Sequence, residues 1–324
     1  MTDRPMRFRV NPFRSTGDDP PPDRTAIRRF HESLEGYRPT PLVRLPSLAR
    51  ATGIEALYVK DESSRFGLDA FKGLGAAWAL HQLVQAGSGL KTVSSATDGN
   101  HGRAVAWTAR RLGLEAMIFM TAHSAPARIE AIRREGATVV LVDGTYDDAV
   151  RICAERSEAH GWQVVADVGY PGYLEIPEWI ADGYETLFAE ITDQLEARQW
   201  PWPDVVVLQA GVGGFAAAGL RHFRPRARSP RIAVVEPVDA DPLLTSALTD
   251  DGSPAVSGGS QHSIMACLNC GTVSLSAWPV LRAGVDVFFS ISDDWAAEAM
   301  RRLGWGAGED PRVTAGESGA AGLA

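Results

Sequence analysis

The chain has 324 residues, of which 45% are hydrophobic and 22% are charged, and its formal net charge is −8. These values are typical of a globular protein with room for one or two domains, each with its own core. The mildly acidic balance gives no reason to expect a nucleic acid or an anionic membrane as partner. Three cysteines cannot build a disulfide framework, so we expect a reducing, cytoplasmic location.

The predicted elements, in chain order, begin with an extended arm at residues 11–25, which are rich in proline and polar groups. From about residue 55, strand-like and helix-like segments alternate. The predicted strands are 56–60, 92–96, 116–120, 138–142, 163–166, 205–208 and 232–235. The predicted helices are 70–85 with Asp69 as N-cap, 103–112, 126–135 and 146–160, followed by a helical stretch at 175–200.

This alternation predicts an α/β fold with mostly parallel sheets flanked by helices. The strands fall into two blocks, 91–169 and 204–236, which predicts two lobes with a cleft between them. The longest apolar run, Val205 to Leu220, is too short to span a bilayer and is interrupted by Gln209 and several glycines. The first ten residues lack the apolar region of a signal peptide.

Lys72 stands out because it lies in DAFKGLGAAWAL, among glycines, alanines and large apolar residues. With Asp69 as N-cap, Lys72 would occupy the third helical position, where the helix dipole and burial both disfavour an ammonium group. Both effects predict a lowered pKa for Lys72. Such a lysine can act as a nucleophilic amine that forms a Schiff base. The alternative is a lysine whose amine extends into solvent.

The segment SATDGNHGR places Asp98, Asn100 and His101 at the carboxyl end of a predicted strand. Open α/β sheets bind ligands at this end, and Gly99 and Gly102 would let the loop approach a ligand closely. The alternative is an ordinary Asp-Gly turn without a ligand.

The segment GVGGFAAAG, residues 211–219, follows the strand VVVLQ and opens a helix. Its glycines can point several N–H groups at one spot, and the helix N-terminus favours an anion there, typically a phosphate. Since the spacing also fits G-x-G-x-x-A and Glu236 ends the next strand, a dinucleotide is one possible ligand. The alternative is a tight turn with no ligand.

Cys267 and Cys270 form one C-x-x-C pair near His262. Structural zinc normally takes four ligands, so these residues favour buried free thiols over a metal site. We therefore expect no metal.

Several segments together resemble the diaminopropionate ammonia-lyase family, a group of fold type II enzymes that depend on pyridoxal 5'-phosphate (PLP). The resemblance covers residues 37 to 323, with all segments in the family's order. The segments are KDESSRFGLDAFKGLG, TDGNHGRAVAW, TYDDAVR, YLEIPEWIADGYETL, LQAGVGG, VVEP, SIMACLNCG and DPRVTAGESGAAGL. The first two are highly specific.

The resemblance implies that Lys72 forms the Schiff base with the cofactor and that Asn100 bonds the cofactor's phenolic oxygen. Gly211, Val212, Gly213 and Gly214 would hold the phosphate. It also implies that Lys72 and Asp98 are the catalytic bases, one for each face of the substrate. Thr97, Asp98, Tyr146 and Asp167 would lie on the substrate side.

The resemblance further implies elimination of ammonia from 2,3-diaminopropionate, which yields pyruvate and a second ammonia, by a cytoplasmic homodimer. It implies a large cofactor-binding domain, 1–90 plus 186–324, and a small domain, 91–185, with the asparagine loop.

Two departures from the family's pattern keep other possibilities open. The chain stops soon after the ESGA segment, where family members continue into a final strand, so we expect one strand and one wall of the cofactor site to be missing. Gly214 and Phe215 stand where the family commonly has a different pair after GVG, and Phe215 could alter packing near the phosphate. The alternatives are an inactive remnant of the family, a serine/threonine dehydratase-like enzyme and an NAD-dependent oxidoreductase. Asp98 argues against the dehydratase, and Lys72 with TDGNHGR against the oxidoreductase.

Overall fold

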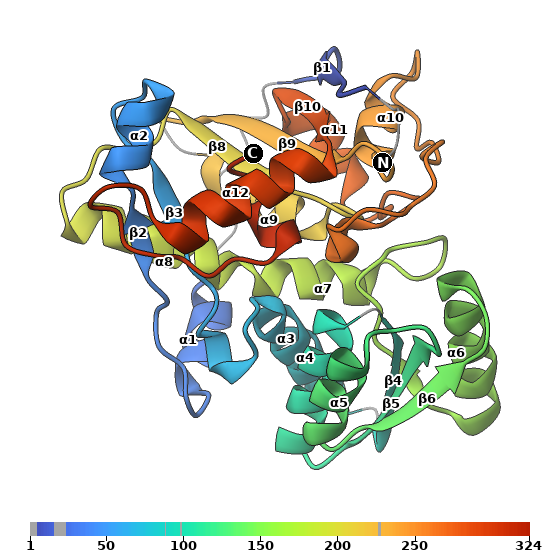
Figure 1. The fold of residues 1–324 in the computed structure, drawn as a ribbon. Coiled ribbons are helices and arrows are strands. Elements are labelled where there is room, and N and C mark those ends of the chain that lie inside the picture. The colour runs from blue at the N-terminus through green and yellow to red at the C-terminus, as the bar shows by residue number, and fades with distance from the viewer. Residues whose placement is uncertain (1–4, 16–23, 88, 98, 226–227) are drawn as a thin grey trace.

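The computed structural model describes residues 5–15, 24–87, 89–97, 99–225 and 228–324. Figure 1 shows two lobes, each containing a sheet, with helix α7 (Glu175–Gly183) running between them. Both sheets are mostly parallel and are flanked by helices, which confirms the predicted α/β fold.

The lobe drawn in green in Figure 1 contains a four-stranded parallel sheet of order β6-β5-β4-β7. Its strands are β4 (Thr92–Ala96), β5 (Glu115–Thr121), β6 (Thr138–Val142) and β7 (Gln163–Val164). Its connecting helices are α4 (Asn100–Arg111), α5 (Pro126–Arg134) and α6 (Tyr146–His160). Helix α6 has the predicted bounds because Thr145 and Asp148 form a capping box at its start and Gly161 ends it in a left-handed conformation.

The other lobe contains a four-stranded sheet of order β1-β10-β9-β8. Its strands are β1 (Phe8–Val10), β8 (Val205–Gln209), β9 (Arg231–Pro237) and β10 (Val287–Ile291), of which only β1 is antiparallel. Helix α9 (Gly214–Phe223) connects β8 to β9. Among the described residues β8 is the edge of this sheet, and the missing final strand stays a prediction.

The remaining elements lie outside the two four-stranded sheets. They are α1 (Thr25–Ser33), the hairpin of β2 (Leu42–Arg44) and β3 (Tyr58–Lys60) with α2 (Pro46–Thr52), η1 (Arg65–Gly67), α3 (Lys72–Gln85), α8 (Glu185–Ala197), α10 (Pro242–Ala247), η2 (Ala266–Leu268), α11 (Trp278–Gly284), α12 (Asp293–Trp305) and α13 (Glu317–Ala320). The sequence pattern did not predict β1, α1, β2, α2 or most elements after β9. Of the predicted arm at 11–25, residues 16–23 lie outside the described part, and residue 25 already belongs to α1.

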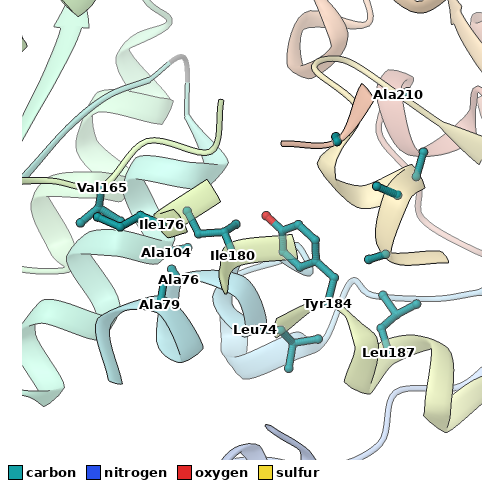
Figure 2. Close-up of a cluster of buried hydrophobic side chains, with 14 of the residues drawn as sticks. Leu74, Ala76, Ala79, Ala104, Val165, Ile176, Ile180, Tyr184, Leu187 and Ala210 are labelled. Atoms are coloured by element: carbon teal, nitrogen blue, oxygen red, sulfur yellow. The ribbon is translucent and has the colours of Figure 1, made fainter. Parts of the chain in front are cut away.

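One hydrophobic core joins the two lobes. Figure 2 shows Ile180 of α7, Tyr184 at the junction of α7 with α8, Leu187 of α8, Leu74 of α3 and Ala210 at the end of β8 as members of this core. All five side chains are at most 2% exposed. The exact domain boundaries, 90/91 and 185/186, therefore remain a prediction, because the core does not separate at either point.

Two predicted helix starts are wrong. Helix α3 begins at Lys72, not at residue 70, because Asp69 adopts a left-handed conformation with φ of 56° and its carboxylate pairs with Arg103 at 3.2 Å. Asp69 is therefore not the N-cap. Helix α4 begins at Asn100 instead of residue 103, so Asn100 and His101 lie in its first turn.

Within the described ranges, no helix is both long enough and apolar enough to cross a membrane.

Candidate active site

A cavity of about 1120 Å³ brings the predicted site residues together. It is lined by the first turns of α3, α4 and α9 and by the segment at 266–272, and it continues along β8. All nine predicted site residues that the structure describes line it: Lys72, Thr97, Asn100, Tyr146, Asp167, Gly211, Val212, Gly213 and Gly214. Asp98 lies outside the described residues.

Lys72 is held in this cavity as the first residue of α3. Its Nζ donates a hydrogen bond of 2.6 Å to Oδ2 of Asp167 and lies 5.5 Å and 5.7 Å from the ring centres of Phe71 and Tyr184. The side chain is 22% exposed. The amine therefore points into the cavity, among two aromatic rings and a carboxylate, and the alternative of a lysine extended into solvent is wrong.

The predicted pKa of Lys72 was wrong in direction. Burial is the largest single effect and would lower this pKa, but the charge of Asp167, its hydrogen bond and the nearby Tyr184 and Cys267 together hold the pKa of Lys72 above its usual range. Burial would likewise raise the pKa of Asp167, yet the charge and hydrogen bond of Lys72, with a contribution from His101, together hold it well below its usual range. The two residues form an ion pair. This pair could not be predicted from the sequence, because the two residues are 95 positions apart.

The loop before α4 is organised by Thr97. Its Oγ1 accepts hydrogen bonds from the backbone N–H groups of Gly99, at 3.0 Å, and Gly102, at 3.2 Å. A Cβ on Gly102 would lie 2.3 Å from Cγ2 of Thr97, so only glycine allows this packing. Asn100 follows with an exposed side chain, whose Nδ2 lies 3.7 Å from Sγ of Cys267. Thr97 thus shapes the loop, in addition to any contact with substrate.

The glycine loop between β8 and α9 is built as a cradle. Gly213 has φ of 101°, and a Cβ there would lie 2.6 Å from Cδ1 of Leu281. A Cβ on Gly214 would meet nothing within 4 Å, so the loop opens into the cavity at that point. The backbone N–H of Ser274 donates a hydrogen bond of 2.8 Å to the Val212 carbonyl and so holds the loop in place. Because the first N–H groups of a helix have no partner within it, this cradle suits a phosphate.

Tyr146 begins α6 at the rim of the cavity and is 40% exposed. Phe215 packs away from the cradle, with its ring 4.6 Å from Phe71 and 5.2 Å from Phe188. Phe215 therefore continues the aromatic cluster around Lys72.

The structure adds His101 and Tyr184 to the site. His101 is 6% exposed, its Nε2 donates to the Val165 carbonyl at 2.9 Å, and its Nδ1 lies 3.8 Å from Oδ2 of Asp167. Burial raises the pKa of Tyr184 to about 12. The position of His101 in TDGNHGR was a signal for the site, but its partner could not be read from the sequence.

Neither Cys267 nor Cys270 forms a disulfide, but Cys267 is exposed at the cavity and Cys270 is only partly buried, so the prediction of two buried thiols is wrong. Within the described ranges, no three His, Cys, Asp or Glu side chains are grouped as metal ligands.

Comparison with known proteins gives the family. The family model for pyridoxal-phosphate dependent enzymes matches residues 34–324. The chain belongs to this family. It is 42% identical, over 91% of its length and 78% of the relative, to diaminopropionate ammonia-lyase of Escherichia coli strain K12. It is 39% identical, over 92% of its length and 80% of the relative, to the enzyme of the same name from Salmonella typhimurium strain LT2.

A solved structure is similar over nearly the whole chain. It is diaminopropionate ammonia lyase from Escherichia coli in complex with an aminoacrylate–PLP azomethine reaction intermediate. The TM-score is 0.92 and the identity 38%, over 99% of this chain and 85% of that one. The resemblance to a fold type II enzyme of this family is therefore confirmed.

Proposed function

We propose that this chain catalyses the PLP-dependent elimination of ammonia from 2,3-diaminopropionate, giving pyruvate and ammonia. The observation that carries the proposal is the meeting of Lys72, Asn100 and the glycine cradle in one cavity. The same fold, at 38% identity, belongs to a diaminopropionate ammonia lyase with a PLP intermediate.

The residues present fit PLP. Lys72 would supply the amine that holds the aldehyde carbon, and the cradle Gly211–Gly214 would hold the phosphate. Asn100, from the first turn of α4, would bond the phenolic oxygen. Bound PLP supplies an electron sink, which makes the α-proton of an amino acid removable.

The chain's own residues would then move protons and orient the substrate. Lys72 would remove the α-proton of one enantiomer, and Asp98 that of the other, because each would face one side of the substrate. Asp98 would also attract the second ammonium group that separates diaminopropionate from serine. Thr97, Tyr146 and Asp167 would contact the substrate, and Asp167 also pairs with Lys72.

We also propose a cytoplasmic homodimer. The support is the family resemblance and the three cysteines, none of which forms a disulfide in the structure. Light scattering on the purified protein tests the dimer, and a mass equal to one chain contradicts it.

The other functions have less support. A dinucleotide would need the Glu236 carboxylate, but Glu236 is fully buried and accepts hydrogen bonds from the backbone of Leu243, at 2.9 Å, and Leu244, at 2.8 Å. Because these contacts already use both carboxylate oxygens of Glu236 at the end of β9, the carboxylate is not available to a dinucleotide, which disfavours the oxidoreductase. An inactive remnant or a dehydratase is separated from the lyase by the test below.

The test combines spectroscopy with product analysis. Protein mixed with PLP is expected to absorb at the violet end of the visible spectrum. It is also expected to release ammonia and pyruvate from 2,3-diaminopropionate. Lys72→Ala should abolish both, whereas the exposed control Lys91→Ala should keep both. Absorbance without ammonia release contradicts the lyase and supports the remnant. Faster turnover of serine or threonine supports the dehydratase.

A further inference from the structure

His101 has a fixed hydrogen-bonding pattern. Its Nε2 lies 2.9 Å from the Val165 carbonyl oxygen. Because a carbonyl oxygen can only accept a hydrogen bond, Nε2 must carry the hydrogen of the neutral ring. Burial lowers the pKa of His101, so the ring stays neutral near pH 7. Its Nδ1 is then an acceptor without a hydrogen.

This bare Nδ1 faces another acceptor. Within the described residues Nδ1 of His101 is buried and has no hydrogen-bond partner. Oδ2 of Asp167 lies 3.8 Å from it. Two acceptors that face each other leave Nδ1 unsatisfied, which is costly in a buried position. A proton on Oδ2 would satisfy it once the two atoms move from 3.8 Å to hydrogen-bond distance.

Lys72 is placed to deliver this proton, although the charged pair is the favoured state of the two residues before reaction. Its Nζ is 2.6 Å from the same Oδ2. An ammonium group has no lone pair, so Lys72 must lose a proton before it can attack an aldehyde carbon. When the proton moves along the hydrogen bond, the ammonium becomes an amine and the carboxylate becomes a carboxylic acid. The net charge of the pair stays at zero.

We propose that His101 is a positioning residue whose Nδ1 accepts a hydrogen bond from protonated Asp167, so that Asp167 can take the proton that Lys72 releases. The proposal rests on the proposed function, because the aldehyde is that of the cofactor. Tyr184 and Cys267 also face Lys72, and Tyr173 faces Asp167. These three groups are unchanged in the variants below.

The test measures the reactivity of Lys72 in the chain without cofactor. Formaldehyde and cyanoborohydride methylate free amines, and mass spectrometry gives the rate at Lys72 between about pH 6 and pH 10. His101→Gln keeps a donor for the Val165 carbonyl but removes the acceptor at the position of Nδ1. His101→Asn places an amide oxygen at that position and gives up the bond to Val165.

In His101→Gln the methylation profile is expected to move up by about one pH unit, so that Lys72 reacts about tenfold more slowly at neutral pH. The profile of His101→Asn should coincide with that of the parent chain. A His101→Gln profile that coincides with that of the parent chain overturns the proposal. Equal shifts in both variants also overturn it, because they indicate a purely structural role.

A second measurement leaves His101 intact. In Lys72→Ala the partly buried Asp167 loses its cation and takes up a proton at a higher pH. Nitrogen NMR should then show Nδ1 of His101 becoming a hydrogen-bonded acceptor while Nε2 keeps its hydrogen. An Nδ1 signal that does not change as Asp167 titrates overturns the proposal. Ammonia release is measured separately, so a shifted profile without ammonia contradicts only the proposed function.

Discussion

At the scale of single residues, the Lys72–Asp167 pair decides the charge inside the cavity. Each partner moves the other's pKa away from neutrality, so both stay charged over a wide pH range. Their side chains are 22% and 25% exposed, so most of the pair is withdrawn from water. Removing one partner would leave the other charge buried without compensation.

Asp167→Asn is therefore expected to lower the free energy of unfolding of the cofactor-free protein by about 2–3 kcal/mol at pH 7. The ordinary pKa values are 3.8 for aspartate and 10.5 for lysine. The pair's contribution is complete between these values, and it is lost as pH falls through the depressed pKa of Asp167 or rises through the raised pKa of Lys72. Urea unfolding at pH 5, 7 and 9 should thus give the same difference.

The exposed control is Asp204→Asn, which breaks the pair with Arg228 at the surface. It should change stability by less than about 0.5 kcal/mol. An effect of Asp167→Asn no larger than this control would mean that the pair does not contribute to the fold.

The sequence predicted these site residues by type and motif, but not their partners. Lys72, Asn100 and Gly211–Gly214 were identifiable because each stands out from the segment around it. The pairing of Lys72 with Asp167, and of both with His101, depends on the packing of three separate segments. For the same reason the predicted direction of the pKa shift of Lys72 was wrong, because the residues near Lys72 in the sequence do not show its partner Asp167.

At the scale of elements, α3 and α7 touch through glycines. A Cβ on Gly75 would lie 2.5 Å from Cε1 of Tyr184 and 2.6 Å from the Ile180 carbonyl oxygen. A Cβ on Gly183 would lie 2.6 Å from the Leu74 carbonyl oxygen. The two backbones are therefore in direct contact, one turn from Lys72.

Gly75→Ala should push these helices apart and lower the free energy of unfolding by about 2–3 kcal/mol. The matched control is Gly304→Ala in α12, where a Cβ would meet nothing within 4 Å. This change should be neutral or raise stability by up to about 1 kcal/mol, because alanine favours helix more than glycine does. Chemical denaturation measures both, and equal effects would contradict the close contact of α3 with α7.

The glycine cradle offers a second matched pair. Gly213→Ala forces a side chain into a left-handed conformation and against Leu281, so we expect a loss of about 1–3 kcal/mol. Gly214→Ala has free space and should leave thermal unfolding almost unchanged. If both variants unfold at the same temperature as the parent, the conformation at Gly213 is not required.

Elements with strong local signals were predicted well. Strands β4 and β6 and helix α6 have the predicted bounds, because apolar runs and a capping box define them. Helix α3 was placed two residues early because nothing in the sequence marks Asp69 as left-handed. Strand β1 has three exposed residues and is defined only by its pairing with β10, almost 280 residues away.

At the scale of the whole molecule, buried polar groups tie the N-terminal segments to the helices between the lobes. Arg65 is 1% exposed and pairs with Glu190 of α8 at 2.8 Å, while Lys60 of β3 reaches the same carboxylate at 2.6 Å. His31 of α1 is fully buried nearby. Its Nδ1 lies 2.7 Å from Oγ1 of Thr186, and its Nε2 lies 2.9 Å from the Leu74 carbonyl oxygen. His31 thus joins α1, α3 and α8.

This position makes His31 sensitive to acid. Burial, reinforced by the charge of Arg65 and opposed by the bond to Leu74 and by Glu190, lowers the pKa of His31 from 6.5 to about 4. Below pH 6.5 the unfolded chain therefore binds a proton that the folded chain does not. Stability must fall as pH drops from 6.5 to about 4, by about 3 kcal/mol for this one group.

His31→Gln should remove this part of the pH dependence. A glutamine cannot become charged, and its amide can still donate to the Leu74 carbonyl, so the variant is less stable at pH 7 but loses less stability toward pH 4. The difference between the two unfolding curves isolates His31 from other groups that titrate in this range, such as Glu190. The exposed His160→Gln serves as control and should follow the parent. Parallel curves for the parent and His31→Gln would mean that the buried imidazole does not couple folding to pH.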